Sequence, residues 1–451
     1  MPKYSKKKSK TPSIISVFQA TVVAIVGIGL TALLFLITQN QDLRQQASTQ
    51  NNTDIVVCPL DSSLTDCNYF GPLGIQQALS AVEPNGQILI KAGQYALDST
   101  SQTVFRIDSK NISIKGEGRY QTTLLHSSNT ENDPGSVIFD IGGNSHVAIS
   151  DLGIVQKGSS LDQRVFAVKA FAYGRDQQNI TVESCYFEGG LGFIPISIGS
   201  YDHSLTNSLV VGNIMIAHYG GIKVYSGSTS DTKAEIKNNI LFGSIDPERR
   251  IVSIISSDPI DGVSGVLTAV VQNNAAGGNG ANAFDCYNAS GNEHSLKCEL
   301  TNNIAFQNSR LGFSSNTVVN FALFEYNLGF ENRAGNWPSG WPGFPPTTNI
   351  SADALFQTSN TTKRVKAEDY MLLPNSPARN GGNPQIFDPD GSRSDIGPLG
   401  GPNACKLLAT LPGCTLPSTP ESKTDPKENK EAGSQILRQQ KEVDVPIRVS
   451  K

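Results

Sequence analysis

The sequence predicts an all-β chain in which short strands stack into one long coil. Seven segments between residues 148 and 330 share one pattern: a strand, a polar corner and a short apolar strand. A second set of strands follows most of them after a polar turn. No helical pattern of about 10–15 residues separates the two sets, which excludes alternating strands and helices.

The repeated segments predict one equivalent corner in successive coils. They are AISDLGI (148–154), TVESCYF (181–187), LTNSLVV (205–211), EIKNNILF (235–242), VVQNNAA (270–276), ELTNNIAF (299–306) and LFEYNLGF (323–330). Their alignment places Leu152, Cys185, Ser208, Asn239, Asn274, Asn303 and Asn327 at that corner. Stacked parallel strands lie about 4.8 Å apart. We therefore expect the asparagines to form a ladder of side-chain amides.

The second strand set alternates apolar and polar residues. Its members are IPISIG (194–199), GGIKVYS (220–226), IVSIISS (251–257), NAFDCY (282–287) and LGFSSN (311–316). Alternation is typical of strands with one buried face. Ile222 and Val224 are expected to point into the coil, and Lys223 and Tyr225 out of it. By the same rule Phe284 points in and Asp285 points out.

Two further segments complete a resemblance to a known family. The segment GIQQALSAVEPNGQILIKAGQYAL (74–97) begins with a helical face formed by Ile75, Ala78, Leu79 and Val82 and then enters the first strand. The segment MLLPNSPARNGGNPQIFDPDGSRSDIGPLGGP (371–402) is similar to a C-terminal segment of bacterial β-helix proteins. Residues 70–400 thus resemble the right-handed parallel β-helix family, the pectate-lyase-like superfold. The resemblance implies a single right-handed parallel β-helix with a short N-terminal capping helix.

The N-terminus predicts a membrane anchor. Five lysines (Lys3, Lys6, Lys7, Lys8 and Lys10) precede an uncharged apolar run from Ile14 to Ile37. About 20 apolar residues suffice to cross a bilayer as a helix. We expect a transmembrane signal anchor over residues 13–38, with the basic segment 1–12 in the cytoplasm. A cleavable signal peptide is the alternative, although no small-residue cleavage site follows the run.

The anchor sets the expected domain order and location. Residues 39–53 form a stalk, residues 54–414 the β-helix domain, and residues 415–451 a charged tail predicted to be disordered. The protein is expected at the cell membrane as a single-pass chain with most of its mass extracytoplasmic. The net charge of −4 excludes the broad basic surface that nucleic-acid binding requires. No nucleic-acid partner is expected.

Cysteine spacing predicts three local disulfides outside the cytoplasm. Six of the seven cysteines form the close pairs Cys58–Cys67, Cys286–Cys298 and Cys405–Cys414. The chain has no CxxC motif and only five histidines, so a zinc site is not expected. Cys185 remains, and its β-like surroundings predict a buried apolar residue.

The family resemblance implies where chemistry could lie. Enzymes of this superfold mostly bind acidic polysaccharides along one outer sheet. A lyase of this kind needs a basic residue to take a proton from a uronate, and Lys223 is the candidate. Candidate catalytic carboxylates are Asp258, Asp261 and Asp285, and candidate substrate contacts are Tyr225, Arg249 and Arg250. No strand carries the paired aspartates of a β-helix hydrolase.

Two alternatives to lyase chemistry stay open. The sequence DPID (258–261) resembles the catalytic motif of alginate epimerases, but the flanking histidine of that family is missing. All the polar residues named for catalysis could equally form a solvated outer face. In that case the chain is a non-catalytic adhesin or an envelope structural protein.

An irregular aromatic loop is the second candidate site. The segment NRAGNWPSGWPGFPP (332–346) contains both tryptophans, Trp337 and Trp341, together with Phe344. Its prolines and glycines exclude regular structure. The rings either form a platform that stacks on sugar rings or pack onto the coil.

The third candidate site is an acidic loop near the C-terminus. Asp388, Asp390 and Asp395 have the spacing D-x-D-G-x-x-x-D, and Gly391 permits a sharp turn. Calcium favours several oxygen ligands from a flexible loop. The loop either holds calcium, the one cofactor considered, or closes the coil without a metal.

Overall fold

The computed structural model describes residues 54–97, 103–127, 136–158, 164–227, 229–244, 250–256, 265–289, 295–358 and 365–414. The predicted anchor, stalk and tail lie outside the described residues, as do Arg249, Asp258 and Asp261. No helix within the described ranges is long and apolar enough to cross a membrane.

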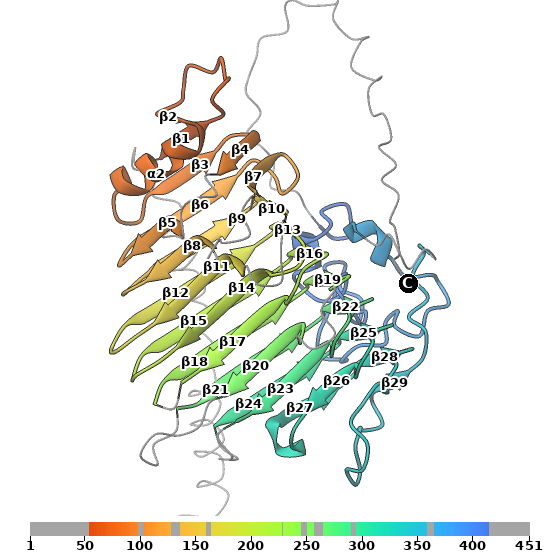
Figure 1. The fold of residues 1–451 in the computed structure, drawn as a ribbon. Helices are drawn as coiled ribbons and strands as arrows, with labels where there is room; N and C mark the ends of the chain where they lie inside the picture. The colour runs from red at the N-terminus through yellow and green to blue at the C-terminus, as the bar shows by residue number, and fades with distance from the viewer. Residues whose placement is uncertain are drawn as a thin grey trace, which may run out of the picture. The chain divides into compact units, whose positions relative to one another are not determined.

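The described chain is a right-handed parallel β-solenoid whose walls are three parallel sheets (Figure 1). Successive coils add one strand to each sheet, so neighbours in a sheet are distant in sequence. The 11-stranded sheet contains β1 (Ile55–Cys58), β2 (Tyr69–Phe70), β3 (Gln87–Ile90), β6 (Asn111–Gly116), β9 (His146–Ser150), β12 (Gln177–Glu183), β15 (Leu205–Val211), β18 (Asp231–Lys237), β21 (Leu267–Gln272), β24 (Leu296–Thr301) and β27 (Phe321–Glu325).

The other two walls have the same parallel register. The 10-stranded sheet contains β4 (Gly93–Leu97), β7 (Thr122–Ser127), β10 (Gly153–Lys157), β13 (Tyr186–Glu188), β16 (Ile214–Ile216), β19 (Ile240–Phe242), β22 (Ala275–Gly277), β25 (Ile304–Phe306), β28 (Leu328–Phe330) and β29 (Ile350–Ser351). The 8-stranded sheet contains β5 (Thr103–Asp108), β8 (Ser136–Gly142), β11 (Val165–Ala172), β14 (Phe193–Ser200), β17 (Ile222–Ser226), β20 (Val252–Ser256), β23 (Phe284–Asn288) and β26 (Phe313–Ser315). The expected all-β coil is confirmed.

The N-terminal end of the coil is closed by α2 (Gly71–Ala81), the capping helix that the sequence predicts. Ile75, Ala78 and Leu79 are buried against the first coils, and Val82 follows the last turn. Pro72 lies in the first turn of the helix, where its missing N–H costs nothing. The cap therefore covers the apolar interior where the first coil would otherwise be open.

The predicted asparagine ladder is present, with one correction in its alignment. Side-chain amides of Asn239, Asn274, Asn303 and Asn327 donate to the next asparagine at 3.0, 3.0, 3.0 and 3.1 Å. The ladder begins at Asn213, which donates to Asn239 at 2.9 Å. Ser208, the residue aligned from sequence, instead lies inside β15. LTNSLVV is a complete strand, and its corner comes after it in VGN.

A second asparagine ladder, which the sequence alignment does not show, lies just after the C-terminal ends of the strands of the 10-stranded sheet. Asn279 donates to Asn308 at 2.9 Å, and Asn308 donates to Asn332 at 2.7 Å. His218 occupies the equivalent corner of an earlier coil and is fully buried. Burial lowers the pKa of His218 to about 3, so the ring is neutral at physiological pH.

The chain after β29 folds back over the outer face of the 10-stranded sheet. We call residues 365–414 the C-terminal segment; it includes the 3-10 turns η2 (Ala367–Tyr370) and η3 (Ala404–Lys406), whereas η1 (Val318–Asn320) precedes β27. Tyr370, Ile396 and Leu407 pack against outward residues of the sheet such as Ile240 and Phe306. This packing buries a sheet face that solvent would otherwise reach.

Asparagines at the sheet corner also hold the C-terminal segment. Asn238, Asn273 and Asn302 have left-handed backbone conformations, with φ of 53°, 53° and 58°. The Asn238 amide donates to the carbonyls of Pro398 and Gly400 at 2.9 and 2.6 Å. The two residues of each repeated NN pair therefore have different tasks. The first binds the C-terminal segment, and the second builds the inner ladder.

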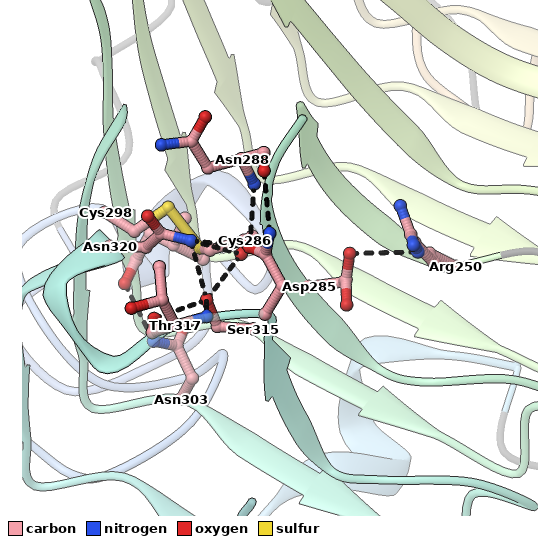
Figure 2. The surroundings of a disulfide bond; sticks show 11 residues. Arg250, Asp285, Cys286, Asn288, Cys298, Asn303, Ser315, Thr317 and Asn320 are labelled. Atoms are coloured by element: carbon pink, nitrogen blue, oxygen red, sulfur yellow. Dashed lines mark hydrogen bonds and ion pairs between the residues drawn. A yellow bond between two sulfur atoms is a disulfide. The ribbon is translucent and has the colours of Figure 1, made fainter. Parts of the chain in front are cut away.

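All three predicted disulfides are present. Cys58–Cys67 joins the end of β1 to the loop before β2, and Cys405–Cys414 closes the C-terminal segment. Cys286–Cys298 joins β23 to β24 inside the coil (Figure 2). Cys185 is free and buried, as expected. Burial raises the pKa of its thiol to about 12, so it remains protonated at neutral pH.

Candidate functional site

The outer face of the 8-stranded sheet carries a column of polar side chains, one from each coil. Strand register aligns Arg106, Asp140, Lys169, Ser197, Lys223, Ser253, Asp285 and Ser314. Alternation explains the column, because the flanking positions, such as Ile222 and Val224, are buried in the core. The expected outward direction of Lys223 and Asp285 is confirmed.

Lys223 and Asp285 are two strands apart in this column, with Ser253 between them. A separation of two strands corresponds to about 10 Å along the sheet. Lys223 also lies beside the chain that enters β20. A β-carbon added to Gly220 would lie 3.2 Å from its Cε and 3.9 Å from the carbonyl oxygen of Arg250. Lys223 therefore lies near the backbone of Arg250, whose side chain points toward Asp285 and Tyr287.

Asp285 is covered by Arg250, although it lies on the outer face. Its side chain is 2% exposed, and its Oδ2 lies 3.0 Å from Arg250 Nε (Figure 2). Burial raises the pKa of Asp285, while Arg250, Ser314 and Asn282 act in the opposite direction. The Arg250 guanidinium also lies over the Tyr287 ring, 4.3 Å from its centroid. Asp285 thus holds Arg250 in place instead of contacting solvent itself.

Three tyrosines form a stack along the same face. The ring of Tyr201 lies 5.3 Å from Tyr173, with planes inclined by 8°, and 4.8 Å from Tyr225. We call Tyr173, Tyr201 and Tyr225 the tyrosine stack. Each comes from a different coil, so ring spacing follows strand spacing. Tyr173 at the end of the stack is 54% exposed, so it offers aromatic surface to a ligand.

Three residues of this face, Tyr173, Tyr201 and Lys169, are not indicated by the sequence patterns. Both tyrosines follow an 8-stranded-sheet strand directly, in the short contexts FAYG and GSYD. An alignment of strand ends in this sheet would have shown tyrosine recurring there. Lys169 can be placed on this face only from the strand register, because β11 is not in the second strand set identified from the sequence. Its ammonium lies 5.9 Å from the centroid of the Phe171 ring.

The aromatic loop after β28 lies at the C-terminal end of the solenoid and contacts the core there. The Trp337 ring stacks on Phe313 at 5.2 Å, and its Nε1 donates to Ser351 Oγ at 3.1 Å. Phe344 stacks on Phe321 at 5.5 Å, and Trp341 contacts Phe344 edge-on at 5.3 Å. These contacts match the packing alternative for the loop. The rings cover the open end of the coil, as α2 does at the other end.

The three aspartates of the acidic loop line a pocket of about 350 Å³ in the C-terminal segment, together with Arg379 and Ser392. Each carboxylate accepts hydrogen bonds within the segment. Asp388 accepts from Gly401 N at 2.5 Å, Asp390 from Ser392 Oγ at 2.7 Å, and Asp395 from Asn380 N at 2.7 Å. Burial, opposed by the Gly401 bond, raises the pKa of Asp388 to about 6. Among the described residues, these carboxylates do not form a group whose oxygens all lie within 4.8 Å of one another.

The three predicted sites therefore lie in different parts of the solenoid. Lys223, Tyr225, Arg250 and Asp285 share the outer face of the 8-stranded sheet. The aromatic loop covers the C-terminal end, and the acidic loop packs over the 10-stranded sheet. A calcium ion in the acidic loop would therefore lie on a different wall from Lys223. It could not serve chemistry at that residue.

Comparison with known proteins finds similarity in fold only. No family model matches the chain, and no curated protein matches it. Among solved structures, pectate lyase Pel9A is 16% identical with a TM-score of 0.40, over 78% of this chain and 97% of that one. An alginate lyase from Paenibacillus sp. str. FPU-7 is 11% identical with a TM-score of 0.27, over 61% and 93%. The A-module of the Azotobacter vinelandii mannuronan C-5 epimerase AlgE4 is 14% identical with a TM-score of 0.26, over 58% and 83%.

Proposed function

We propose that the protein binds an acidic polysaccharide along the outer face of the 8-stranded sheet. The observation that carries this proposal is the tyrosine stack, with the cations Lys169, Lys223 and Arg250 on the same outer face. Flat aromatic rings suit the apolar faces of sugars. Cations spaced along the coils suit a polymer that carries a carboxylate on repeated units. A small ligand would need a concave pocket instead of an extended face.

Arg250 is the proposed carboxylate contact of this face. Asp285 holds its Nε at 3.0 Å and Tyr287 lies against its ring plane. The two Nη atoms are on the other edge of the guanidinium, and a pair of parallel N–H groups matches a carboxylate. Asp285 is a positioning residue in this proposal. Its 2% exposure leaves it no surface with which to touch a polymer.

The neighbourhood of Lys223 and Arg250 favours a second candidate function, lyase-type cleavage of the bound polymer. Lys223, as the neutral amine, would accept the C5 proton of a uronate, and the released electron pair would form a C4–C5 double bond. The C4–O bond breaks, and the departing oxygen takes a proton to become a hydroxyl group. Arg250 would stabilise the charge that develops on the carboxylate. A non-catalytic adhesin or envelope protein uses the same face without the elimination.

The binding proposal is tested with the full chain and a panel of uronate polymers, including polygalacturonate and alginate. Tyr173→Ala is expected to weaken binding about tenfold, because it removes the exposed ring of the stack. A neutral polymer of similar length should bind far more weakly. Equal affinity of the wild-type chain for charged and neutral polymers would contradict the proposal.

Cleavage is tested on the same panel, with and without calcium, by the ultraviolet absorbance of unsaturated uronates. Lys223→Ala should abolish any activity while leaving the fold intact. Lys233→Ala is the matched control, since Lys233 is exposed on the outer face of β18 in a different sheet. Binding without new absorbance would assign the non-catalytic role. Activity that survives Lys223→Ala would refute the choice of base.

We further propose that the chain is held at the cell membrane by residues 13–38, with the solenoid outside. The uncharged apolar run after a lysine-rich segment supports this part of the proposal. The three disulfides support an oxidising, extracytoplasmic location. Flotation of the full chain with lipid vesicles, resistant to high salt, tests it. A chain that remains in the dense fraction would contradict it.

A further inference from the structure

The N-terminal end of the solenoid exposes more apolar surface than a cap requires. We call residues 58–81, which comprise the Cys58–Cys67 loop, β2 and α2, the N-terminal cap. Leu60 is 77% exposed, Leu64 49%, Phe70 42% and Leu73 70%. Four large apolar side chains within so short a stretch form a candidate interaction surface.

Two of these side chains can be placed around the start of α2. Leu60 lies directly over Gly71, where an added β-carbon would be 2.6 Å from its Cγ. Gly71 begins α2, so Leu60 lies next to the helix start that carries Leu73. Leu73 also lines a groove of about 450 Å³ between α2 and the first coils, together with Ala96, Leu97 and Val104. Exposed apolar side chains therefore surround the N-terminal end of the coil, from the disulfide loop to the strands β4 and β5.

The chain that precedes the N-terminal cap indicates what covers this surface. The apolar run ends at Ile37, and 16 residues (38–53) separate it from the first described residue, Asp54. A chain of that length spans at most about 55 Å at full extension. If residues 14–37 cross a bilayer, the cap is held within this short distance of the lipid surface. Tethering raises the effective concentration of cap and bilayer to the millimolar range.

Charge at the cap distinguishes apolar insertion from electrostatic attachment. Residues 54–90 contain four acidic residues (Asp54, Asp61, Asp66 and Glu83) and no lysine or arginine, and the neighbouring cations Lys91 and Lys110 contact Asp66 and the carbonyl of Leu79. Anionic lipids attract basic segments, so this surface gains nothing from them. Exposed leucine and phenylalanine side chains instead favour the boundary between headgroups and acyl chains.

We propose that Leu60, Leu64, Phe70 and Leu73 dock the N-terminal cap onto the bilayer that holds the chain. This inference rests on the membrane-anchor part of the proposed function. Docking would hold the first coil at the membrane surface, so that the polymer-binding sheet begins there. The anchor supplies attachment, and the four side chains fix which end of the solenoid faces the lipid.

The test uses the full-length chain in phosphatidylcholine vesicles whose acyl chains carry bromine, which quenches nearby tryptophan. Leu73→Trp and, separately, Leu60→Trp each add an indole to the cap at a highly exposed position. Most of the added emission should be lost in brominated vesicles. Leu373→Trp is the matched control, because Leu373 is an exposed leucine of the C-terminal segment. Its added emission should remain, as should that of Trp337 and Trp341.

The outcomes separate the docking inference from the anchor. A chain that floats with vesicles but shows no quenching at either cap position keeps its anchor and overturns docking. A chain that does not float overturns both. Quenching that requires phosphatidylserine would also overturn the inference, since it would indicate electrostatic attachment. Adding Leu64→Asp to the Leu73→Trp variant should restore most of the quenched emission.

Discussion

At the residue scale, burial gives similar side chains different roles. Asp285 and Glu235 both lie on outward positions of strands and both pair with a cation. Asp285 is 2% exposed and Arg250 32%, so water can reach the guanidinium but not the carboxylate, and the loss of Asp285 removes a buried partner of Arg250. Glu235 pairs with Lys237 at the surface, where water replaces a lost partner.

Replacing Asp285 should therefore affect binding through Arg250. We expect Asp285→Asn to lower the affinity for uronate polymers about tenfold and the free energy of unfolding by about 1–3 kcal/mol. Glu235→Gln should change either quantity little, by about 0.5 kcal/mol or less. Calorimetric titration and denaturant unfolding measure the two effects. An unchanged affinity in Asp285→Asn would show that Arg250 does not need this partner.

Asp388 predicts a specific pH dependence. Its pKa is about 6 in the folded chain, above its ordinary value of 3.8. The folded state therefore binds the proton more tightly than the unfolded state, and this contribution to stability falls as pH rises from about 4 to about 6. Asp388→Asn should remove that part of the slope in unfolding measured between these pH values. Asp390→Asn is the control, because Asp390 is exposed and its pKa is lowered. A slope unchanged by Asp388→Asn would contradict the assignment.

At the element scale, each NN corner joins two structures through neighbouring residues. The Asn274 amide donates to Ile236 O, Gln272 O and Asn303 Oδ1 at 2.7, 3.0 and 3.0 Å. The Asn273 amide instead donates to Asp395 O and Gly397 O in the C-terminal segment, at 2.9 and 3.2 Å. The inner ladder replaces hydrogen bonds that the backbone cannot make at a corner.

Replacing Asn274 and replacing Asn273 should have different effects on stability. Asn274→Ala leaves several buried groups without partners, and we expect it to cost about 3–5 kcal/mol of unfolding free energy. Asn273→Gly keeps the left-handed conformation and should mainly loosen the C-terminal segment. Hydrogen exchange of residues 380–400 should rise in Asn273→Gly while exchange in β21 and β24 stays slow. Equal loss of protection in both regions would contradict this division of roles.

At the scale of the whole solenoid, stability depends on closing both ends of the coil. The apolar interior runs continuously from Ile75 under α2 to Phe324 near the aromatic loop. An open end would expose core side chains and the hydrogen-bonding edges of terminal strands. Trp337 and Phe344 close the C-terminal end by packing on Phe313, Phe321 and Phe324.

Trp337→Ala should therefore destabilise the solenoid. We expect a loss of about 3 kcal/mol, at the lower end of tryptophan truncations because the ring is half-buried. Trp341→Ala should cost less, since its ring contacts Phe344 and Phe321 only edge-on. Thermal unfolding measures both. If Trp337→Ala melts as the wild type does but loses affinity for uronate polymers, the loop is a sugar platform after all.

The sequence by itself determined the coil, the capping helix, the disulfides and the direction of Lys223 and Asp285. Each depends on local pattern: strand alternation, the helical spacing of Ile75, Ala78 and Leu79, or close cysteine spacing. Such patterns can be read from the sequence because they show which face of a helix or strand is buried. The prediction of a corner at Ser208 was wrong because loop lengths vary between coils. The repeat alone could not show that Asn213, and not Ser208, occupies the corner.

Only the tertiary structure decided which distant residues share a surface. Three coils lie in register, and this stacks the rings of Tyr173, Tyr201 and Tyr225. Arg250 covers Asp285 because it lies just before the adjacent strand. The three aspartates of the acidic loop proved to lie over a different wall from Lys223. In a solenoid, lateral neighbours are a whole coil apart in sequence, and coil length varies with every loop. The register between coils therefore determines which residues share the site. That register exists only once the coils are stacked.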